Sequence, residues 1–478
     1  MAGRPIVTRQ PNERLQSLIQ EAACSNAGLA RRVNMCGAEH GVDLRYDKTS
    51  VARWLRGQQP RGQAPQMIAE ALGRKLGRTV SLEEIGMSDG RHQSSAVGLT
   101  YAPTIGETLD QVIELWRSDV ARREFLTDAA PVAAALVEPS RDWLISGFGG
   151  AGGTVTEIPQ RTGPRVGRMD ATAVAAAAES LIRLDHRFGA GHLRPVVVHY
   201  LNSVVAGLLD GSYTEEVGRV LIEATARLCE LAGYMAADTG RPGLAQRYYI
   251  QALRLAEAAG ARGFGGYVLA AGMSHLAGSL GSPREAVQLA RAAQEGTRGK
   301  VPSRAVALFA AAEARAAAAL GDGPACREAA ARALSAMERA AGGGARAGGG
   351  DPPWVARFDR AYLAGELAHC HLDLGQPAAA EKRAAEALAA HPESRVRRRG
   401  FTLALLARAQ AEQRDVDRAC RTGTRAAELI EQVRSARGAQ YVADLTQALL
   451  PYGQEPAVQE FLARNGGTGP SPAPARGL

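Results

Sequence analysis

The sequence contains few aromatic residues and almost no lysine. Phe, Trp and Tyr together make up 5% of the 478 residues, and only four of the 57 basic residues are lysine. Sheets favour aromatic and β-branched residues, whereas alanine, which is abundant here, is the strongest helix former. We therefore expect an all-α fold. Arginine, alanine and glycine share GC-rich codons, so we ascribe the excess of arginine to a GC-rich genome.

Clustered cysteines and long apolar runs are also missing. The spacing of the six cysteines matches neither a zinc site nor a disulfide framework. No apolar run approaches the roughly 20 residues of a membrane-spanning helix, and no signal peptide is present. We expect a reduced, cytoplasmic protein without membrane contact, metal or cofactor. No nucleophile–base pair or carboxylate pair stands out, so we expect no enzyme and no catalytic residues.

Three patterns that resemble binding sites have simpler explanations. Gly147–Gly152 matches GxGxxG, but that fingerprint must open a helix after a strand, and the residues that follow start a helix poorly. His186 and His192 flank a glycine turn at a helix end and lack the spacing of metal ligands. We expect the arginines at 395 and 397–399 to be a solvated surface rather than a second nucleic-acid site.

Residues 1–88 show the pattern of a domain with five short helices. Apolar residues recur at helical spacing in the first helix, which begins near Asn12, and in the second, which Ser25 or Asn26 caps. Pro65 opens the fourth helix, and Ser81 begins a capping box for the fifth. This arrangement is typical of a helix-turn-helix domain.

The third helix, residues 48–56, divides into two faces as a recognition helix does. Asp47 caps it, and Val51, Trp54 and Leu55 share the face that packs on the bundle. The opposite face carries donors for base edges and phosphates; the alternative is a basic face that is merely solvated. We expect Lys48, Thr49 and Arg53 to read base edges. We expect Arg45, Arg56 and Arg61 to contact phosphates.

Almost all of the net positive charge lies in the same region. Residues 1–80 contain thirteen Lys and Arg against six Asp and Glu, which accounts for +7 of the formal net charge of +8. A polyanion gains most from charge that is concentrated in this way. We therefore expect double-stranded DNA as the partner of this region, which would place the protein on the nucleoid when bound.

The remainder of the chain contains a recurrent helical pattern. A leading residue is followed five, nine and twelve residues later by small residues, with leading positions at Gly240, Gly281, Gly321, Gly375 and Arg414. Small residues allow two antiparallel helices to approach closely, with the glycine in the turn between them. The pattern resembles tetratricopeptide repeats, which stack into a solenoid with a concave groove. The alternative is a generic alanine-rich helical bundle.

A groove of this kind binds a peptide, a small molecule or a protein segment, or mediates dimerisation. We expect Arg247, Tyr248, Tyr249 and Arg315 to line it, although a tyrosine pair at helical spacing also suits a core. We also expect a homodimer. The chain then divides into a helix-turn-helix domain at 1–88, a linker at 89–106, a helical segment with a glycine-rich flexible loop at 107–170, repeats at 171–464 and a disordered tail at 465–478.

The segment Tyr46–Gly62 resembles a group of actinobacterial regulators that join an XRE-type helix-turn-helix to tetratricopeptide-like repeats. Leu184–Gly189 and Gly243–Tyr249 are similar to the same group. The group includes negative regulators of streptomycete differentiation and antibiotic production. The resemblance, which covers residues from about 12 to 450, implies a transcriptional repressor of development or secondary metabolism.

Two functional hypotheses follow from the sequence. The first is a DNA-binding repressor whose repeats sense a ligand, dimerise or bind a partner. The second is an adaptor that acts through protein–protein contacts without binding DNA. Replacing Lys48 and Arg53 with alanine distinguishes them, because only a DNA-binding protein would lose its sequence preference.

Overall fold

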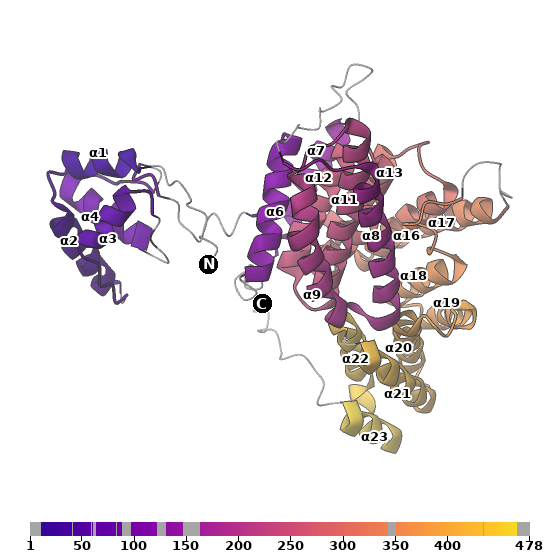
Figure 1. The fold of residues 1–478 in the computed structure, drawn as a ribbon. Helices are drawn as coiled ribbons and strands as arrows, with labels where there is room; N and C mark the ends of the chain where they lie inside the picture. Colours follow the sequence, from indigo (N-terminus) through magenta and orange to yellow (C-terminus); the bar gives the residue numbers. More distant parts are fainter. Residues whose placement is uncertain are drawn as a thin grey trace, which may run out of the picture. The chain divides into compact units, whose positions relative to one another are not determined.

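The computed structural model describes residues 11–40, 42–58, 60, 64–82, 84–87, 97–121, 131–146, 163–342, 350–433 and 435–465. The chain divides between Val97 and Gly98 into two compact units, and this point lies inside the expected linker 89–106. Within the described ranges every regular element is helical, apart from one isolated bridge between Arg165 and Ser212. The predicted all-α fold is confirmed (Figure 1). None of the helices in these ranges has the length and apolar character needed to cross a bilayer.

The first unit contains four helices: α1 (Glu13–Glu21), α2 (Asn26–Glu39), α3 (Lys48–Leu55) and α4 (Ala64–Leu76). Asn12, Ser25 and Asp47 cap the first three by accepting hydrogen bonds from backbone amides of the first turn. Ser81 and Glu84 form the expected reciprocal hydrogen bonds. The residues described there, 81, 82 and 84–87, form turns at 82 and 84–86 and no helix, although a fifth helix was expected.

The first unit is built around one apolar cluster to which all four helices contribute. Leu15, Leu29, Val51 and Ile68 are fully buried in it, one from each helix. The side chain of Asn12 ties the start of the unit to its end, because Nδ2 donates to the carbonyl of Ile85 at 2.9 Å. α3 therefore rests on a closed scaffold rather than on a single neighbouring helix.

The second unit begins with a layer of helices that precede the repeats. They are α6 (Ile105–Ala121), η1 (Ala133–Leu136), α7 (Val137–Ser146), α8 (Arg168–Phe188), α9 (Ala190–Tyr200), η2 (Leu201–Val205) and α10 (Ala206–Leu209). The pattern Gly147–Gly152 and most of the expected glycine-rich loop lie outside the described residues.

Helical hairpins follow one another through the rest of this unit, as in a solenoid (Figure 1). They are α11 (Glu215–Asp238) with α12 (Pro242–Ala258); α13 (Arg262–Tyr267), η3 (Val268–Ser274) and α14 (His275–Ser279) with α15 (Pro283–Gly296); α16 (Ser303–Ala319) with α17 (Gly323–Gly342); α18 (Arg360–Asp373) with α19 (Pro377–Ala390); α20 (Val396–Glu412) with α21 (Val416–Val433); and α22 (Ala436–Leu449) with η4 (Leu450–Tyr452) and α23 (Pro456–Asn465).

The five predicted leading positions all lie in the turns between paired helices. Gly240, Gly281, Gly321 and Gly375 have φ between 66° and 80°, and Arg414 has φ of 66° although it carries a side chain. Only glycine adopts this left-handed conformation without a steric cost. The fifth repeat therefore keeps the turn geometry after losing the glycine. Of the fifteen small or aromatic positions that define the repeats, all but Ala330 are buried.

An irregular strap of residues 98–104 is bound to α12. Gln251 Nε2 donates to the carbonyls of Gly98 and Thr100 at 3.0 Å each, and Arg254 Nε donates to the carbonyl of Ala102 at 2.6 Å. α6 follows directly and is capped by Thr104, because the amide of Glu107 donates to the Thr104 hydroxyl. The C-terminal part of the expected linker thus belongs to the second unit.

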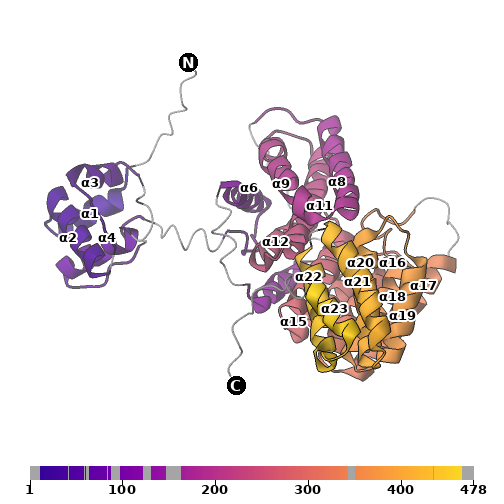
Figure 2. The ribbon, with the colours of Figure 1, turned by 90° about the horizontal axis from the view of Figure 1, so that it is seen from below.

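The last repeats of the second unit return to its first helices (Figure 2). α20 contacts α8, and α22 contacts α11. In an open solenoid each repeat contacts only its neighbours. Here helices some two hundred residues apart in the sequence lie side by side.

Candidate nucleic-acid interface

The start of α3 is fixed by a capping box. The Asp47 carboxylate accepts hydrogen bonds at 2.8 Å from the amide and from the hydroxyl of Ser50. These bonds lower the pKa of Asp47. Val51 and Trp54 are buried one turn later, and the ring of Tyr46 meets Trp54 edge to face at 4.9 Å. The helix is therefore held both at its end and along its inner face.

The segment before α3 is bound to α2. The side chain of Asn34 accepts from the amide of Tyr46 and donates to its carbonyl, both at 2.9 Å. A Cβ on Gly37 would lie 2.6 Å from Leu44 Cδ1, so only glycine allows this close approach. Sequence reasoning missed both residues. The signal for Gly37 was a glycine inside a helix, which costs about 1 kcal/mol and therefore requires a packing reason.

The outer face of α3 carries the predicted donors. Lys48, Thr49, Arg53 and Arg56 are all exposed. Arg53 Nε donates to the carbonyl of Thr49 at 3.4 Å and Arg56 Nε to that of Ala52 at 3.2 Å. Among the described residues no carboxylate pairs with either arginine or with Lys48. Their charges are thus available to a ligand.

Arg45 and Arg61, the two remaining residues predicted to contact phosphates, differ from the donors on the outer face of α3. Arg45 is 85% exposed but pairs with Asp43 at 3.0 Å, so a phosphate would have to compete with that carboxylate. Arg61 lies outside the described residues.

Some basic residues in the rest of this unit are neutralised by carboxylates. Arg74 pairs with Glu39 and Glu70, and Arg78 pairs with Glu21 and Glu84. Six described Lys and Arg of the first unit have no carboxylate partner: Arg31, Arg32, Lys48, Arg53, Arg56 and Lys75. Five of the six lie on α2 or on α3 and its C-terminal cap, so the uncompensated charge is concentrated there.

One feature departs from the minimal helix-turn-helix pattern. Residues 40–47 connect α2 to α3, which makes this connection eight residues long. A turn of three or four residues is typical of the motif. The contacts of Asn34 and Gly37 compensate for the extra length, because they fix the connection to α2.

The prediction that Arg247, Tyr248 and Tyr249 line a groove is wrong. At most 2% of each residue is exposed, and the hydroxyl of Tyr248 donates to the buried Asp119 at 2.8 Å. The cause is the layer of α6, α7 and the strap, which covers the side of α12 that a solenoid would leave open. Arg315 is 28% exposed and pairs with Glu366 at 2.9 Å.

The prediction of a solvated arginine cluster at 395 and 397–399 is also wrong. Arg397 is buried against Asp185 at 2.8 Å, and Arg395 pairs with Asp359 at 2.8 Å. Arg398 lies over the ring of Tyr362, and Arg399 donates to the carbonyl of His391 at 3.0 Å. These side chains join separate helices of the second unit.

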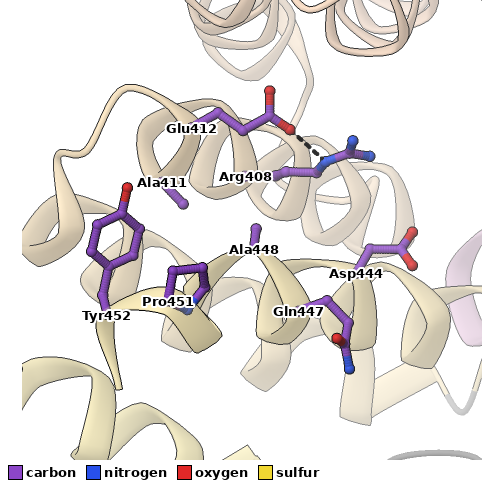
Figure 3. A pocket seen from close by; sticks show the side chains of 8 residues that line it. All are labelled: Arg408, Ala411, Glu412, Asp444, Gln447, Ala448, Pro451 and Tyr452. Atoms are coloured by element: carbon purple, nitrogen blue, oxygen red, sulfur yellow. Dashed lines mark hydrogen bonds and ion pairs between the residues drawn. The ribbon is translucent and has the colours of Figure 1, made fainter. Parts of the chain in front are cut away.

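A surface hollow of about 500 Å³ lies between α20 and the end of α22 (Figure 3). Arg408 and Glu412 line one side and pair at 2.9 Å, while Asp444 and Tyr452 come from the other side. The hollow contains no nucleophile beside a base. Within the described residues there is also no group of three His, Cys, Asp or Glu side chains able to hold a metal ion.

A family model described as the SP15 N-terminal domain matches residues 15–88. The match covers α1 to α4 and less than a sixth of the chain. No curated protein matches the chain. The first unit is thus similar to this domain as a separate module, and the description of the domain specifies no ligand.

Proposed function

We propose that the chain is a transcription regulator that binds double-stranded DNA through the outer face of α3, and that it represses genes of differentiation or secondary metabolism. The observation that carries the proposal is the exposed, uncompensated set of Lys48, Arg53 and Arg56 on a helix that is fixed from behind by Asp47 and Trp54. A recognition helix needs this combination of rigid anchoring and free donors. The second unit then senses a ligand, dimerises or binds a partner.

The contacts on α3 divide by position. Lys48, Thr49 and Arg53 lie at the N-terminal end or one turn from it, where base edges are read, and Arg53 is suited to a bidentate contact with guanine. Arg56 lies at the C-terminal cap, and Arg45 lies in the preceding segment. Both suit phosphate contacts, which position a protein without reading sequence.

Selection of binding sites from random duplexes by the full chain, followed by fluorescence anisotropy, tests the proposal. Arg53→Ala should cost about 1–3 kcal/mol and relax the preference at one base pair. Arg56→Ala should weaken binding to all sequences and reduce the log–log salt slope by about 1. Lys75→Ala is the matched control, because Lys75 is exposed and unpaired but lies on α4; its affinity should not change.

The eight-residue connection favours keeping the adaptor as a second candidate, since it departs from the motif. An adaptor would bind no duplex tightly in this selection. It would also keep its regulatory phenotype when Lys48 and Arg53 are replaced by alanine. The absence of tight binding to any duplex would refute the DNA-binding proposal, and binding without sequence enrichment and without loss in Arg53→Ala would refute base readout by α3.

A further inference from the structure

The first helices of the hairpins share a polar interior in the second unit. Arg397 of α20 reaches Asp185 of α8 at 2.8 Å and Asp238 of α11 at 3.5 Å. The hydroxyl of Ser435, which caps α22, donates to the same Asp238 at 2.8 Å. Helices from both ends of the unit thus meet around this interior (Figure 2).

Three arginines in this interior remain accessible to solvent. The side chains of Arg315, Arg398 and Arg437 are 28%, 29% and 34% exposed. Arg398 lies 3.5 Å from the centre of the Tyr362 ring, and Arg437 lies 5.2 Å from that of Tyr234. Cationic groups held over aromatic rings are thereby oriented without being neutralised.

The carboxylates of the interior are too few for its arginines. Glu366 is shared between Arg315 at 2.9 Å and Arg398 at 3.6 Å. Asp238 is shared between Arg397 at 3.5 Å and Arg437 at 3.9 Å. With Asp185, three carboxylates form ion pairs with these four guanidinium groups. Arg398 and Arg437 have the longest contacts and are the least compensated.

Burial shifts the pKa values of three groups in or beside this interior. Burial raises the pKa of Glu230 to about 8, so that this carboxyl is mostly protonated at neutral pH and adds little negative charge. Burial, together with the charges of Arg315, Arg437 and Arg398, lowers the pKa of His275 to about 4. Burial also lowers the pKa of Arg398, to about 10, and the charge of Arg437 contributes; Arg398 still remains charged at neutral pH.

We propose that Arg398 and Arg437 bind the anionic group of a small organic molecule, a carboxylate or a phosphate monoester, whose planar body packs against the tyrosines around them. Guanidinium groups bind both anions through paired hydrogen bonds. Contacts of α20 with α8 and of α22 with α11 bring the two ends of the unit together beside these arginines, and we therefore take the ligand to be a small molecule rather than a long peptide. This site would be the ligand-sensing site of the proposed regulator, so its role in regulation rests on the proposed function.

Isothermal titration calorimetry of the full chain in the absence of DNA tests this site. A failure of the anion to bind is therefore distinguishable from a failure of the chain to bind DNA. The probes are phenyl phosphate and benzoate, with phenol as the neutral analogue. We expect at least one anion to bind and phenol not to bind. The anion that binds more tightly indicates whether the natural ligand carries a carboxylate or a phosphate monoester.

Matched variants locate the site. Arg398→Gln and Arg437→Gln should each weaken binding of the anion at least tenfold. Arg418→Gln should leave it unchanged, because Arg418 lies on α21 and is 50% exposed, paired with Glu381 and Asp415. Glu366→Gln should tighten binding several-fold, because it removes the carboxylate that competes for Arg315 and Arg398.

The proposal is overturned if phenol binds as tightly as the anions, if no probe binds at millimolar concentration, or if both arginine variants bind like the wild type. Circular dichroism establishes whether each variant keeps its helix content. Where an arginine variant unfolds, Glu366→Gln decides: a tightened affinity supports the site, and an unchanged or weakened affinity refutes it.

Discussion

Replacing Asp185 with alanine should destabilise helices at both ends of the second unit. The pair of Asp185 and Arg397 is 2% and 6% exposed, and two hydrogen bonds of 2.8 and 3.4 Å join it. Removing one partner of a buried pair costs about 3–5 kcal/mol, because the other charge stays buried without its counter-ion. Asp238, 3.5 Å from Arg397, compensates in part. We therefore expect a loss near the lower limit, about 3 kcal/mol.

Hydrogen exchange measured by mass spectrometry resolves this loss by segment. A change of about 3 kcal/mol lowers protection on the order of 100-fold, and it should appear in peptides from α8 and α20 alike. The double variant Asp185→Leu with Arg397→Met should recover part of the protection, since an apolar pair of similar volume is often neutral, but it also removes one of the two arginines beside the buried Asp238. A loss of less than about 1 kcal/mol, or one confined to α8, would refute the reasoning.

Three further predictions follow from local geometry. Asn34→Ala removes both hydrogen bonds to the backbone of Tyr46 and should destabilise the first unit by about 1–3 kcal/mol; urea titration followed by Trp54 fluorescence measures this, and an unchanged midpoint would contradict it. Arg414→Gly should stabilise the second unit by about 0.5–1 kcal/mol, because it relieves the left-handed strain. Gly321→Ala, at φ of 80° with no neighbour within 4 Å, should destabilise the unit by about the same amount in the same titration. Shifts of equal sign in the two variants would contradict the reasoning. The stability of Glu230→Gln relative to the wild type should rise as the pH rises from about 4.5 to about 8, since folding must keep the Glu230 carboxyl protonated above its unfolded pKa. Thermal melts across this pH range test the prediction, and a relative stability that falls with pH would disprove it.

Local periodicity was enough to predict the features that depend on neighbouring residues. The cap at Asp47, the buried face of α3 and the turn at Arg414 all follow from spacing within one or two helices. The sequence could not show that Arg397 pairs with Asp185, 212 residues away, because nothing near either residue indicates its partner.

Arg247, Tyr248 and Tyr249 were misplaced for a related reason. The strap that covers α12 has no periodicity of its own and is held by side-chain hydrogen bonds from Gln251 and Arg254 to its backbone carbonyls. An irregular segment of this kind leaves no pattern in the sequence. The outer face of α3 was predictable in contrast, because exposed residues on a short amphipathic helix are identified by elimination once the buried face is known.

The return of α20 and α22 to α8 and α11 limits how this protein can change in evolution. An open solenoid gains or loses repeats by duplication or deletion, since each repeat needs only its two neighbours. Here one added or removed hairpin would carry Arg397 and Ser435 away from Asp185 and Asp238. The number of repeats is therefore fixed by a contact between the two ends of the unit, and variation is confined to insertions between hairpins, where the residues near 343–350 already lengthen one interval.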